Sequence, residues 1–340
     1  MGSLQSMDSW RDEWRVPSTS AITQARQRLG ADPLRLLFER VTVPVAGLGT
    51  KGAWLASRRL MAIDGFMLDV PDTPENAAAF GRHGNGLKQS ALPQVLVVAL
   101  AECGSHAIIG AAFDGCRSGE QTLAADLAGD LEANMLVMAD RNFYSYHLWE
   151  TYRHSGADLL WRASASIDLP VVEWLPDGSY LSLIFNPRTS KSRRKRMIED
   201  ARNGVGVDPE FGHLIRVVEY DIPDREGNGK DEIICLITSI LNPAEVSAVE
   251  LAAAYHERWE FEGLIDEIKT HQRGPARVLR SRSPEMVRQE IWSLLLTHYA
   301  IRRLMCRAAD EAAVDPDRLS FMRSLRVIRR QVTAQADFSP

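Results

Sequence analysis

Short apolar runs bounded by turn residues recur through the middle of the chain and predict buried strands. A polar connection over residues 72–86 joins the first two runs, and a tight turn at 102–105 joins the second and third. Residues 118–131 and 145–154 have helical periodicity and predict helices ahead of the fourth and fifth strands. The five predicted strands cover residues 59–70, 93–100, 106–113, 135–139 and 158–164.

Three strands, a helix, a strand, a helix and a strand are the order of the ribonuclease-H-like fold. That fold is a mixed sheet covered by helices, in which acidic residues at strand ends hold divalent metal ions. Residues 167–240 add further strand-like runs. We therefore predict an α/β protein: a ribonuclease-H-like mixed sheet with flanking helices, interrupted by a β-rich insertion before the last helix of the catalytic unit.

Both ends of the chain are predicted to be helical. Residues 21–29 form an amphipathic helix closed by Gly30, and a second helix extends from Asp32 to Val41. A DNA-binding helix-turn-helix and a plain helical hairpin both fit this pair. The predicted organisation is a helical segment with part of a DNA-binding region at 1–50, a catalytic domain at 55–166 and 241–275, an insertion domain at 167–240 and an Arg-rich helical segment at 276–340.

Composition narrows the class of protein. Of the 340 residues, 45% are hydrophobic and 25% charged, as in ordinary soluble globular proteins. No apolar run reaches the roughly 18 residues of a membrane span, and the first residues lack a signal-peptide pattern. The four cysteines are far apart and form no C-x-x-C pair, which is typical of reduced thiols. We therefore expect a cytoplasmic protein without membrane contact.

Charge is unevenly distributed along the chain. The net charge of −5 argues mildly against nucleic-acid binding. However, residues 188–202 contain seven basic and two acidic side chains, and residues 271–307 contain eight arginines and two glutamates. Each basic stretch either contacts DNA phosphates or forms solvated surface, and the sequence leaves both interpretations open.

Residues 255–269 carry an unusual set of side chains on what we predict to be one helix. A capping box precedes this segment and a Gly-Pro stop follows it. At about 100° per residue, four side chains fall within about 60° of one another. These are Tyr255, Arg258, Glu262 and Lys269. A core face is apolar and a solvated face scatters its charges, so this stripe predicts a functional surface.

Two aspartates occupy positions that are costly for a carboxylate. Asp64 lies within the first predicted strand and Asp140 ends the fourth, and a buried carboxylate needs a partner or a metal ion. Each alone is more often a turn former or half of a salt bridge. With Glu262 they supply three carboxylates, which suits phosphodiester cleavage by two Mg²⁺ ions about 3.5–4 Å apart. The three neighbours of Glu262 on the stripe would then hold the DNA backbone.

The stripe resembles a family signature. Tyr, two residues, Arg, three residues, Glu, six residues and Lys is the signature of the transposases of insertion-sequence family four. Tyr255, Arg258, Glu262 and Lys269 match it without a gap. By this likeness, Tyr255, Arg258 and Lys269 bind DNA phosphates beside the cleaved bond.

Other segments resemble the same family, so that the likeness covers roughly residues 10–335. They are residues 18–29, which look like the segment ahead of the catalytic domain, and residues 62–65 and 140–145, which look like the two aspartate motifs. The resemblance implies that Asp64, Asp140 and Glu262 are a DDE triad that is both catalytic and metal-binding. It also implies cut-and-paste transposition with two Mg²⁺ ions, for which Mn²⁺ can substitute.

The expected partners follow from the resemblance. They are double-stranded DNA, as the inverted-repeat ends of the transposon and as target, and a second copy of the chain in a synaptic complex. The expected location is the bacterial cytoplasm, in association with the nucleoid. Phe66 departs from the family, which often has Thr there, and the N-terminal region looks shorter than in relatives.

Several alternatives stay open from the sequence. A shortened copy is compatible with a catalytically silent DNA-binding remnant, and the fold alone is compatible with a ribonuclease-H-like nuclease. His147 and His154 lie seven residues apart on one predicted helix, where packing or capping is a commoner role than metal binding. Trp259 either stacks on a base or, as we expect, packs its helix against the core.

Overall fold

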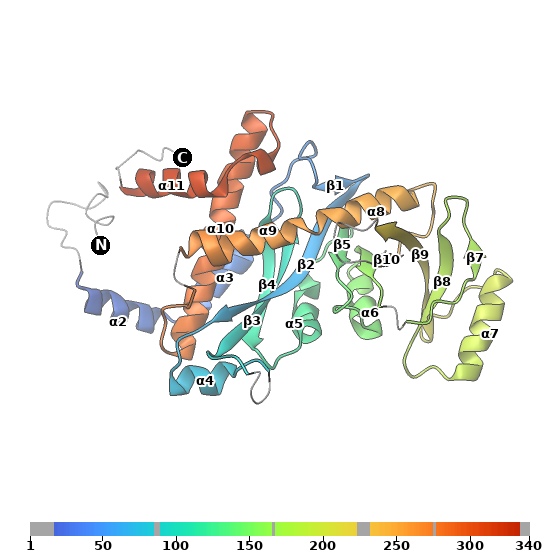
Figure 1. Cartoon of the computed structure of the whole chain (residues 1–340), viewed down its shortest axis with the longest axis horizontal. Helices are drawn as coiled ribbons and strands as arrows, with labels where there is room; N and C mark the ends of the chain where they lie inside the picture. The colour runs from blue at the N-terminus through green and yellow to red at the C-terminus, as the bar shows by residue number, and fades with distance from the viewer. Residues whose placement is uncertain (1–16, 85–88, 165–166, 223–231, 275–276, 334–340) are drawn as a thin grey trace.

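One long sheet with helices on both faces makes up most of the molecule (Figure 1). The computed structural model describes residues 17–84, 89–164, 167–222, 232–274 and 277–333. The strand order is β4-β3-β2-β5-β6-β10-β9-β8-β7, and β1 pairs with β2 off this path. The strands are β1 Trp54–Leu55, β2 Arg58–Asp69, β3 Gln94–Glu102, β4 Ala107–Gly115, β5 Met135–Ala139, β6 Asp158–Arg162, β7 Glu173–Trp174, β8 Tyr180–Phe185, β9 Gly212–Ile222 and β10 Glu232–Thr238.

The first part of the sheet mixes antiparallel and parallel pairing. β2, β3 and β4 are antiparallel neighbours. β2 is parallel to β5, and β5 to β6, with α5 (Glu120–Asp126) and α6 (Tyr146–His154) in the connections that parallel pairing requires. The expectation of a mixed sheet with flanking helices is confirmed, and the five predicted strands lie within two residues of observed ones.

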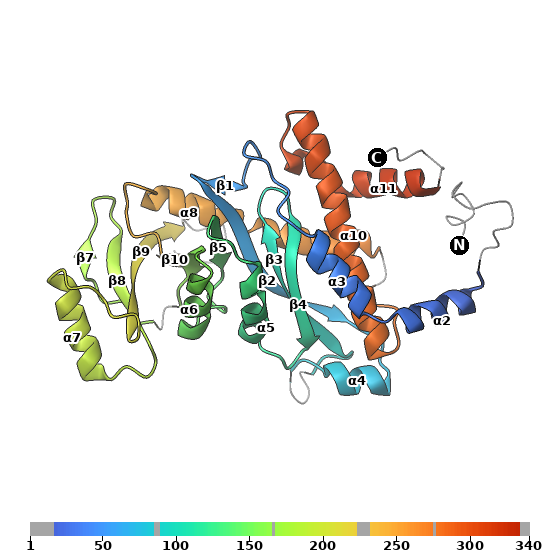
Figure 2. The same ribbon diagram turned by 180° about the vertical axis from the view of Figure 1, so that it is seen from behind.

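The sheet separates two hydrophobic cores. Successive β2 side chains point to opposite faces, so Leu60 and Ala62 join one core while Met61 and Ile63 join the other. Helices α3, α8, α9 and α10 cover the first core, and α5, η2 and α6 cover the second (Figure 2). The covering helices not yet given are α3 Asp32–Val41, η2 Leu127–Asp130, α8 Ala248–Glu257, α9 Glu260–Asp266 and α10 Pro284–Glu311.

Two short helices lie where no helix was predicted. Residues 72–86 contain α4 (Pro74–Phe80), whose first turn is capped by the Thr73 hydroxyl. The basic stretch is α7 (Lys191–Arg202), and Ser190 caps it in the same way. Neither helix shows a clear apolar stripe in the sequence, because the first is only seven residues long and the second buries no side chain. The other helices are α2 Thr19–Leu29, η3 Glu267–Gln272, η4 Pro316–Arg318 and α11 Phe321–Thr333.

The prediction of one regular helix over residues 255–269 is wrong. The α-helical pattern is interrupted at Arg258 and Trp259, whose N–H groups donate to carbonyls only three residues back. The segment then ends in the π-helix η3. Its three pieces still follow one line over the sheet (Figure 1). Since tighter and wider turns depart from 3.6 residues per turn, the angles of an ideal helical wheel do not hold across this segment.

The β-rich segment continues the main sheet. β10 pairs antiparallel with β6 on one side and with β9 on the other. β8 and β7 follow, so the strands between residues 167 and 240 extend the sheet away from β4. The turn predicted at 226–230 lies outside the described residues. Among the helices that the structure describes, none is long and apolar enough to cross a membrane.

Candidate active site

Strand register places Asp64 and Asp140 side by side. β2 and β5 are parallel, and Ile63 is paired with Ala139. Asp64 and Asp140 are the next residues on the two chains, at the end of this ladder. The two carboxylates lie close enough that the charge of Asp140 raises the pKa of Asp64. The structure thus brings together two of the three predicted carboxylates.

The Asp64 carboxylate is largely buried and is held at both oxygens. Its Oδ1 accepts from the Gly65 N–H at 2.8 Å, and its Oδ2 accepts from Arg258 Nη1 at 2.9 Å. The side chain is 23% exposed and that of Arg258 is 10% exposed. Burial raises the pKa of Asp64 despite these two partners, since the charged form loses its water. The predicted DNA-binding residue Arg258 is therefore a direct partner of a predicted metal ligand.

Asp140 is fixed by its own loop and by the residue that precedes it. Its Oδ1 accepts from the Asn142 N–H at 2.7 Å, which is a local turn. The carbonyl of Ala139 accepts from the Tyr255 hydroxyl at 3.3 Å. Tyr255 is buried, and this burial raises its pKa to about 12. Tyr255 thus ties α8 to the end of β5 and keeps the Asp140 backbone in place.

A further carboxylate, Glu120, lies beside the aspartate pair and was not predicted. A Cβ on Gly65 would lie 2.6 Å from Glu120 Oε1, so this oxygen rests against the β2 backbone. Burial and then the charges of Asp140 and Asp64 raise the pKa of Glu120. The only sequence signal was an acidic residue in the first turn of a predicted helix, which normally indicates capping. Glu120 is therefore a carboxylate near the aspartate pair, in addition to the three that were predicted.

Glu262 and Lys269 lie on the two later pieces of the 255–269 segment. Glu262 lies on α9 and is exposed to solvent. Lys269 lies in η3, where it lines a cavity of about 560 Å³ together with Asp69, at the opposite end of β2 from Arg58. Among the described residues, Tyr255 bonds to Ala139, the residue before Asp140, and Arg258 bonds to Asp64. The roles of Glu262 and Lys269 stay predictions.

The donor set at Asp64 suits a hard divalent cation. Asp64, Asp140 and Glu120 offer only carboxylate oxygens, the ligands that Mg²⁺ and Mn²⁺ prefer. Their mutual repulsion and burial favour a positive charge between them, and in this structure Arg258 supplies that charge. Arg258 Nε is buried and has no hydrogen-bond partner among the described residues. The chemistry of these side chains therefore fits metal ions together with a phosphate.

The remaining candidates have different surroundings. His147 and His154 are exposed on α6 and belong to no cluster of metal-binding side chains among the described residues. Trp259 is 51% exposed, so the expectation that it packs against the core is wrong. Its ring lies 5.5 Å from the Arg258 guanidinium carbon. The exposed Trp259 ring therefore lies near Arg258, the partner of Asp64, and one interpretation from the sequence, stacking on a base, stays open.

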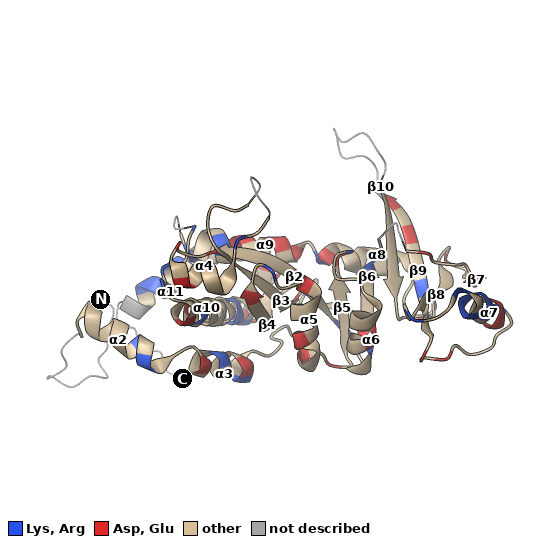
Figure 3. Cartoon of the chain, turned by 90° about the horizontal axis from the view of Figure 1, so that it is seen from below, with Lys and Arg blue, Asp and Glu red and all other residues tan. Residues whose placement is uncertain are grey.

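Basic side chains gather on α7 at the far end of the sheet (Figure 3). The Arg193 guanidinium carbon lies 3.5 Å from the centre of the Phe211 ring, and Arg202 donates to the Val171 carbonyl. Lys195 and Arg196 are exposed. No α7 residue is buried. The basic side chains of α7 are thus exposed to solvent, on a segment far from Asp64 in the sequence.

Comparison with known proteins identifies related sequences along nearly the whole chain. The family model described as "Transposase DDE domain" matches residues 55–299, and the model described as "Insertion element 4 transposase N-terminal" matches residues 1–39. The transposase InsG for insertion sequence element IS4 of Escherichia coli K12 is 30% identical over 326 residues. That match covers 94% of this chain and 69% of InsG.

Two further similarities are shorter or weaker. InsZ of the same strain is 36% identical over 145 residues, which cover 42% of this chain and 48% of InsZ. Among solved structures, a piggyBac transposase synaptic complex with hairpin DNA aligns with 81% of this chain and 52% of its own. The sequence identity there is 11% and the TM-score is 0.44.

Proposed function

The chain belongs to the DDE transposase family, and we propose that it cuts the ends of an insertion sequence and joins them to target DNA. In this proposal Asp64, Asp140 and Glu262 are the triad. The observation that carries it is the pair of partly buried aspartates that follow the paired residues Ile63 and Ala139 of two parallel strands. Such carboxylates are expensive to bury without a cation.

The topology supports the finer fold assignment. In chain order, β2, β3, β4, β5 and β6 occupy the sheet order 3-2-1-4-5, with the pairing directions given above. We propose that this unit is the ribonuclease-H-like core. The strands between residues 167 and 240 would then be an insertion that extends its sheet, and the N- and C-terminal helices would be accessory segments.

The carboxylates would hold two divalent ions, Mg²⁺ in our proposal and Mn²⁺ as a substitute. When bound, such ions activate water and stabilise the leaving oxygen in phosphodiester cleavage. Asp64 and Asp140 would bind directly. Glu262, which is exposed on α9, would complete the triad, and Glu120 lies near the two aspartates. The side chains would have to be ionised, which burial opposes at Asp64 and Glu120.

Arg258 would serve the DNA backbone. Its Nη1 donates a hydrogen bond to Asp64. Its Nε has no hydrogen-bond partner among the described residues, so this N–H is available to donate to an acceptor on the DNA. A phosphate beside Asp64 would give Arg258 a second acceptor. The guanidinium would then donate hydrogen bonds both to Asp64 and to the phosphate. Tyr255 would position this site through its bond to the Ala139 carbonyl, and Lys269 would bind phosphate farther along β2.

The test is cleavage of labelled transposon-end DNA by the purified chain with Mg²⁺. We expect nicking by the wild type and none by Asp64→Asn or Glu262→Gln, with DNA binding largely kept. Asp126→Asn, an exposed carboxylate change on α5, is the control and should cut normally. Cleavage by both triad variants at the wild-type rate would refute the assignment.

A second measurement addresses the partners. We propose that double-stranded DNA ends assemble two copies of the chain. Light scattering of the chain with and without end DNA should therefore show a DNA-dependent change from one copy to two. A silent DNA-binding remnant would bind the ends but leave them uncut under the same conditions. A stand-alone nuclease would cut DNA without regard to end sequence.

A further inference from the structure

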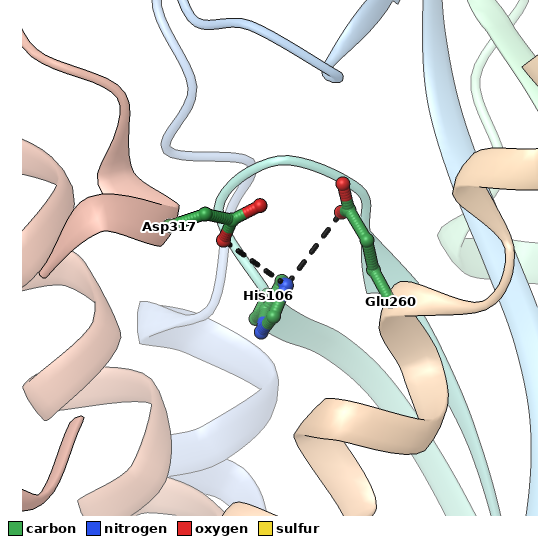
Figure 4. A group of neighbouring side chains, drawn as sticks. All are labelled: His106, Glu260 and Asp317. Carbon is green, nitrogen blue, oxygen red and sulfur yellow. Dashed lines mark ion pairs between the residues drawn. The ribbon is translucent and has the colours of Figure 1, made fainter. Parts of the chain in front are cut away.

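His106, Glu260 and Asp317 form a second cluster of metal-binding side chains, and they come from three distant parts of the chain (Figure 4). His106 ends the turn between β3 and β4, Glu260 is the first residue of α9, and Asp317 belongs to η4 between α10 and α11. One ligand atom from each lies within 4.8 Å of the others. The cluster shares no residue with the Asp64 site.

The imidazole of His106 has an unsatisfied atom that faces both carboxylates. His106 is 9% exposed, and its Nε2 is buried without a hydrogen-bond partner among the described residues. Nε2 lies 3.6 Å from Glu260 Oε2 and 3.4 Å from Asp317 Oδ1. These separations exceed those of ordinary hydrogen bonds. A buried polar atom without a hydrogen-bond partner is rare, and two carboxylates face this one.

The same separations suit a shared metal ion. Zn²⁺ binds imidazole nitrogen and carboxylate oxygen at about 2.0–2.2 Å in tetrahedral geometry, which places neighbouring ligand atoms about 3.4 Å apart. The distances from Nε2 to the two oxygens agree with that value.

The surroundings provide a second layer of support for the imidazole. His106 Nδ1 lies 3.8 Å from Glu267 Oε1, and Arg302 contacts both groups. In this structure Nδ1 accepts from Arg302, because a guanidinium can only donate. For Nε2 to bind a metal ion, Nδ1 must carry the proton, so Arg302 would have to release Nδ1 and leave Glu267 to accept from it. Glu260 is held from the other side, because its Oε2 accepts from the Gly104 N–H. Two of the three ligands are thus already positioned.

We propose that His106, Glu260 and Asp317 bind one Zn²⁺ ion, or a transition-metal ion of similar chemistry, which fastens η4 to the start of α9. A nitrogen ligand with two carboxylates favours such an ion over Mg²⁺, which prefers oxygen ligands and water. The ion would connect the C-terminal helices to the helix that carries Glu262, two residues beyond Glu260. It would act as a structural clamp and take no part in DNA cleavage.

The test measures Zn²⁺ binding after removal of the proposed catalytic ligands. The parent is the full chain with Asp64→Asn, Asp140→Asn and Glu262→Gln, stripped with chelator and dialysed against Zn²⁺. We expect one Zn²⁺ per chain, and visible Co²⁺ absorption bands when Co²⁺ replaces it. Adding His106→Asn or Asp317→Asn should weaken binding by roughly tenfold or more.

The variants are chosen so that folding can be checked separately. His106 has a positive φ of 56°, which asparagine tolerates, and the Asp317 side chain is 42% exposed. His256→Asn and Asp310→Asn, exposed changes outside the cluster, should leave binding unchanged. Absence of stoichiometric Zn²⁺ in the parent would overturn the proposal, and so would equal affinity in parent and Asp317→Asn. Because the catalytic ligands are absent, either result is independent of the transposase assignment.

Discussion

The contact between Arg258 and Asp64 should be worth more than an exposed ion pair of the same length. The atoms Nη1 and Oδ2 are 2.9 Å apart, and the two side chains are 10% and 23% exposed. Arg35 and Glu39 on α3 lie 2.8 Å apart but are 42% and 48% exposed. Distance is therefore matched and burial differs, which makes the second pair an internal control.

The perturbation is a double-mutant cycle with Arg258→Met and Asp64→Asn. Arg258→Met removes the only side-chain donor, among the described residues, to the partly buried Asp64 carboxylate, so we expect a loss of about 2–3 kcal/mol in the free energy of unfolding. The two changes together should cost about 1–3 kcal/mol less than their sum, because each removes the same interaction. For Arg35→Met and Glu39→Gln, the corresponding coupling should be roughly 0.5 kcal/mol or less.

Urea denaturation, followed by circular dichroism at neutral pH in chelator, measures both cycles. Chelator is needed because a cation at Asp64 would replace Arg258 and hide the effect. Additivity at Arg258 and Asp64 to within about 0.5 kcal/mol would refute the view that this pair balances charge in the metal-free site. An equally large coupling in the α3 pair would show that burial is not the cause.

Three other predictions concern different parts of the molecule. Glu120→Gln should shift the acid limb of Mg²⁺-dependent cleavage to lower pH, because it removes a carboxyl whose own pKa is raised by burial and by the charges of Asp140 and Asp64; an unchanged pH–rate profile would contradict this. Glu267→Gln should cost about 3–5 kcal/mol, since Glu267 accepts from buried Arg302 and His298, and thermal unfolding measures the loss. Burial alone would raise the pKa of Glu267, but these partners hold it below its usual 4.5. The stabilisation from Glu267 is therefore present above pH 4.5 and is lost as the pH falls. The glutamine variant should lack this acid dependence. Lys195→Gln with Arg196→Gln on α7 should reduce the slope of log binding constant against log salt by about 2 if both contact phosphates, and an unchanged slope would assign α7 to solvated surface.

The strands and the aspartate pair were predictable because their signals are local. Apolar runs of strand length define β2 and β5, and an aspartate that interrupts or ends such a run is visible without any contact map. The fold of the first five strands then brings the two runs into one sheet. Glu120 was not predictable in the same way, because an acidic residue at the start of a helix has an ordinary capping explanation.

The stripe at 255–269 shows where periodicity fails. A helical wheel assumes 3.6 residues per turn, whereas this segment contains a tight turn at Arg258 and a π-helix from Glu267. Tyr255 and Arg258 are consequently buried beside the aspartates, while Glu262 is exposed and Lys269 lines another cavity. Tyr255 and Arg258 bond at the aspartate pair, and the roles of Glu262 and Lys269 stay predictions.

The sequence by itself determined the order of strands, the family and the residue types of the proposed triad, because these depend on neighbouring residues and spacing along the chain. Only the tertiary structure decided which charges meet. Arg258 and Asp64 are 194 positions apart, and His106 and Arg302 are 196 apart. Contacts over such separations arise when helices pack across a sheet, which no local pattern encodes. The pairing of Asp64 with Arg258 and the cluster around His106 are therefore properties of the fold.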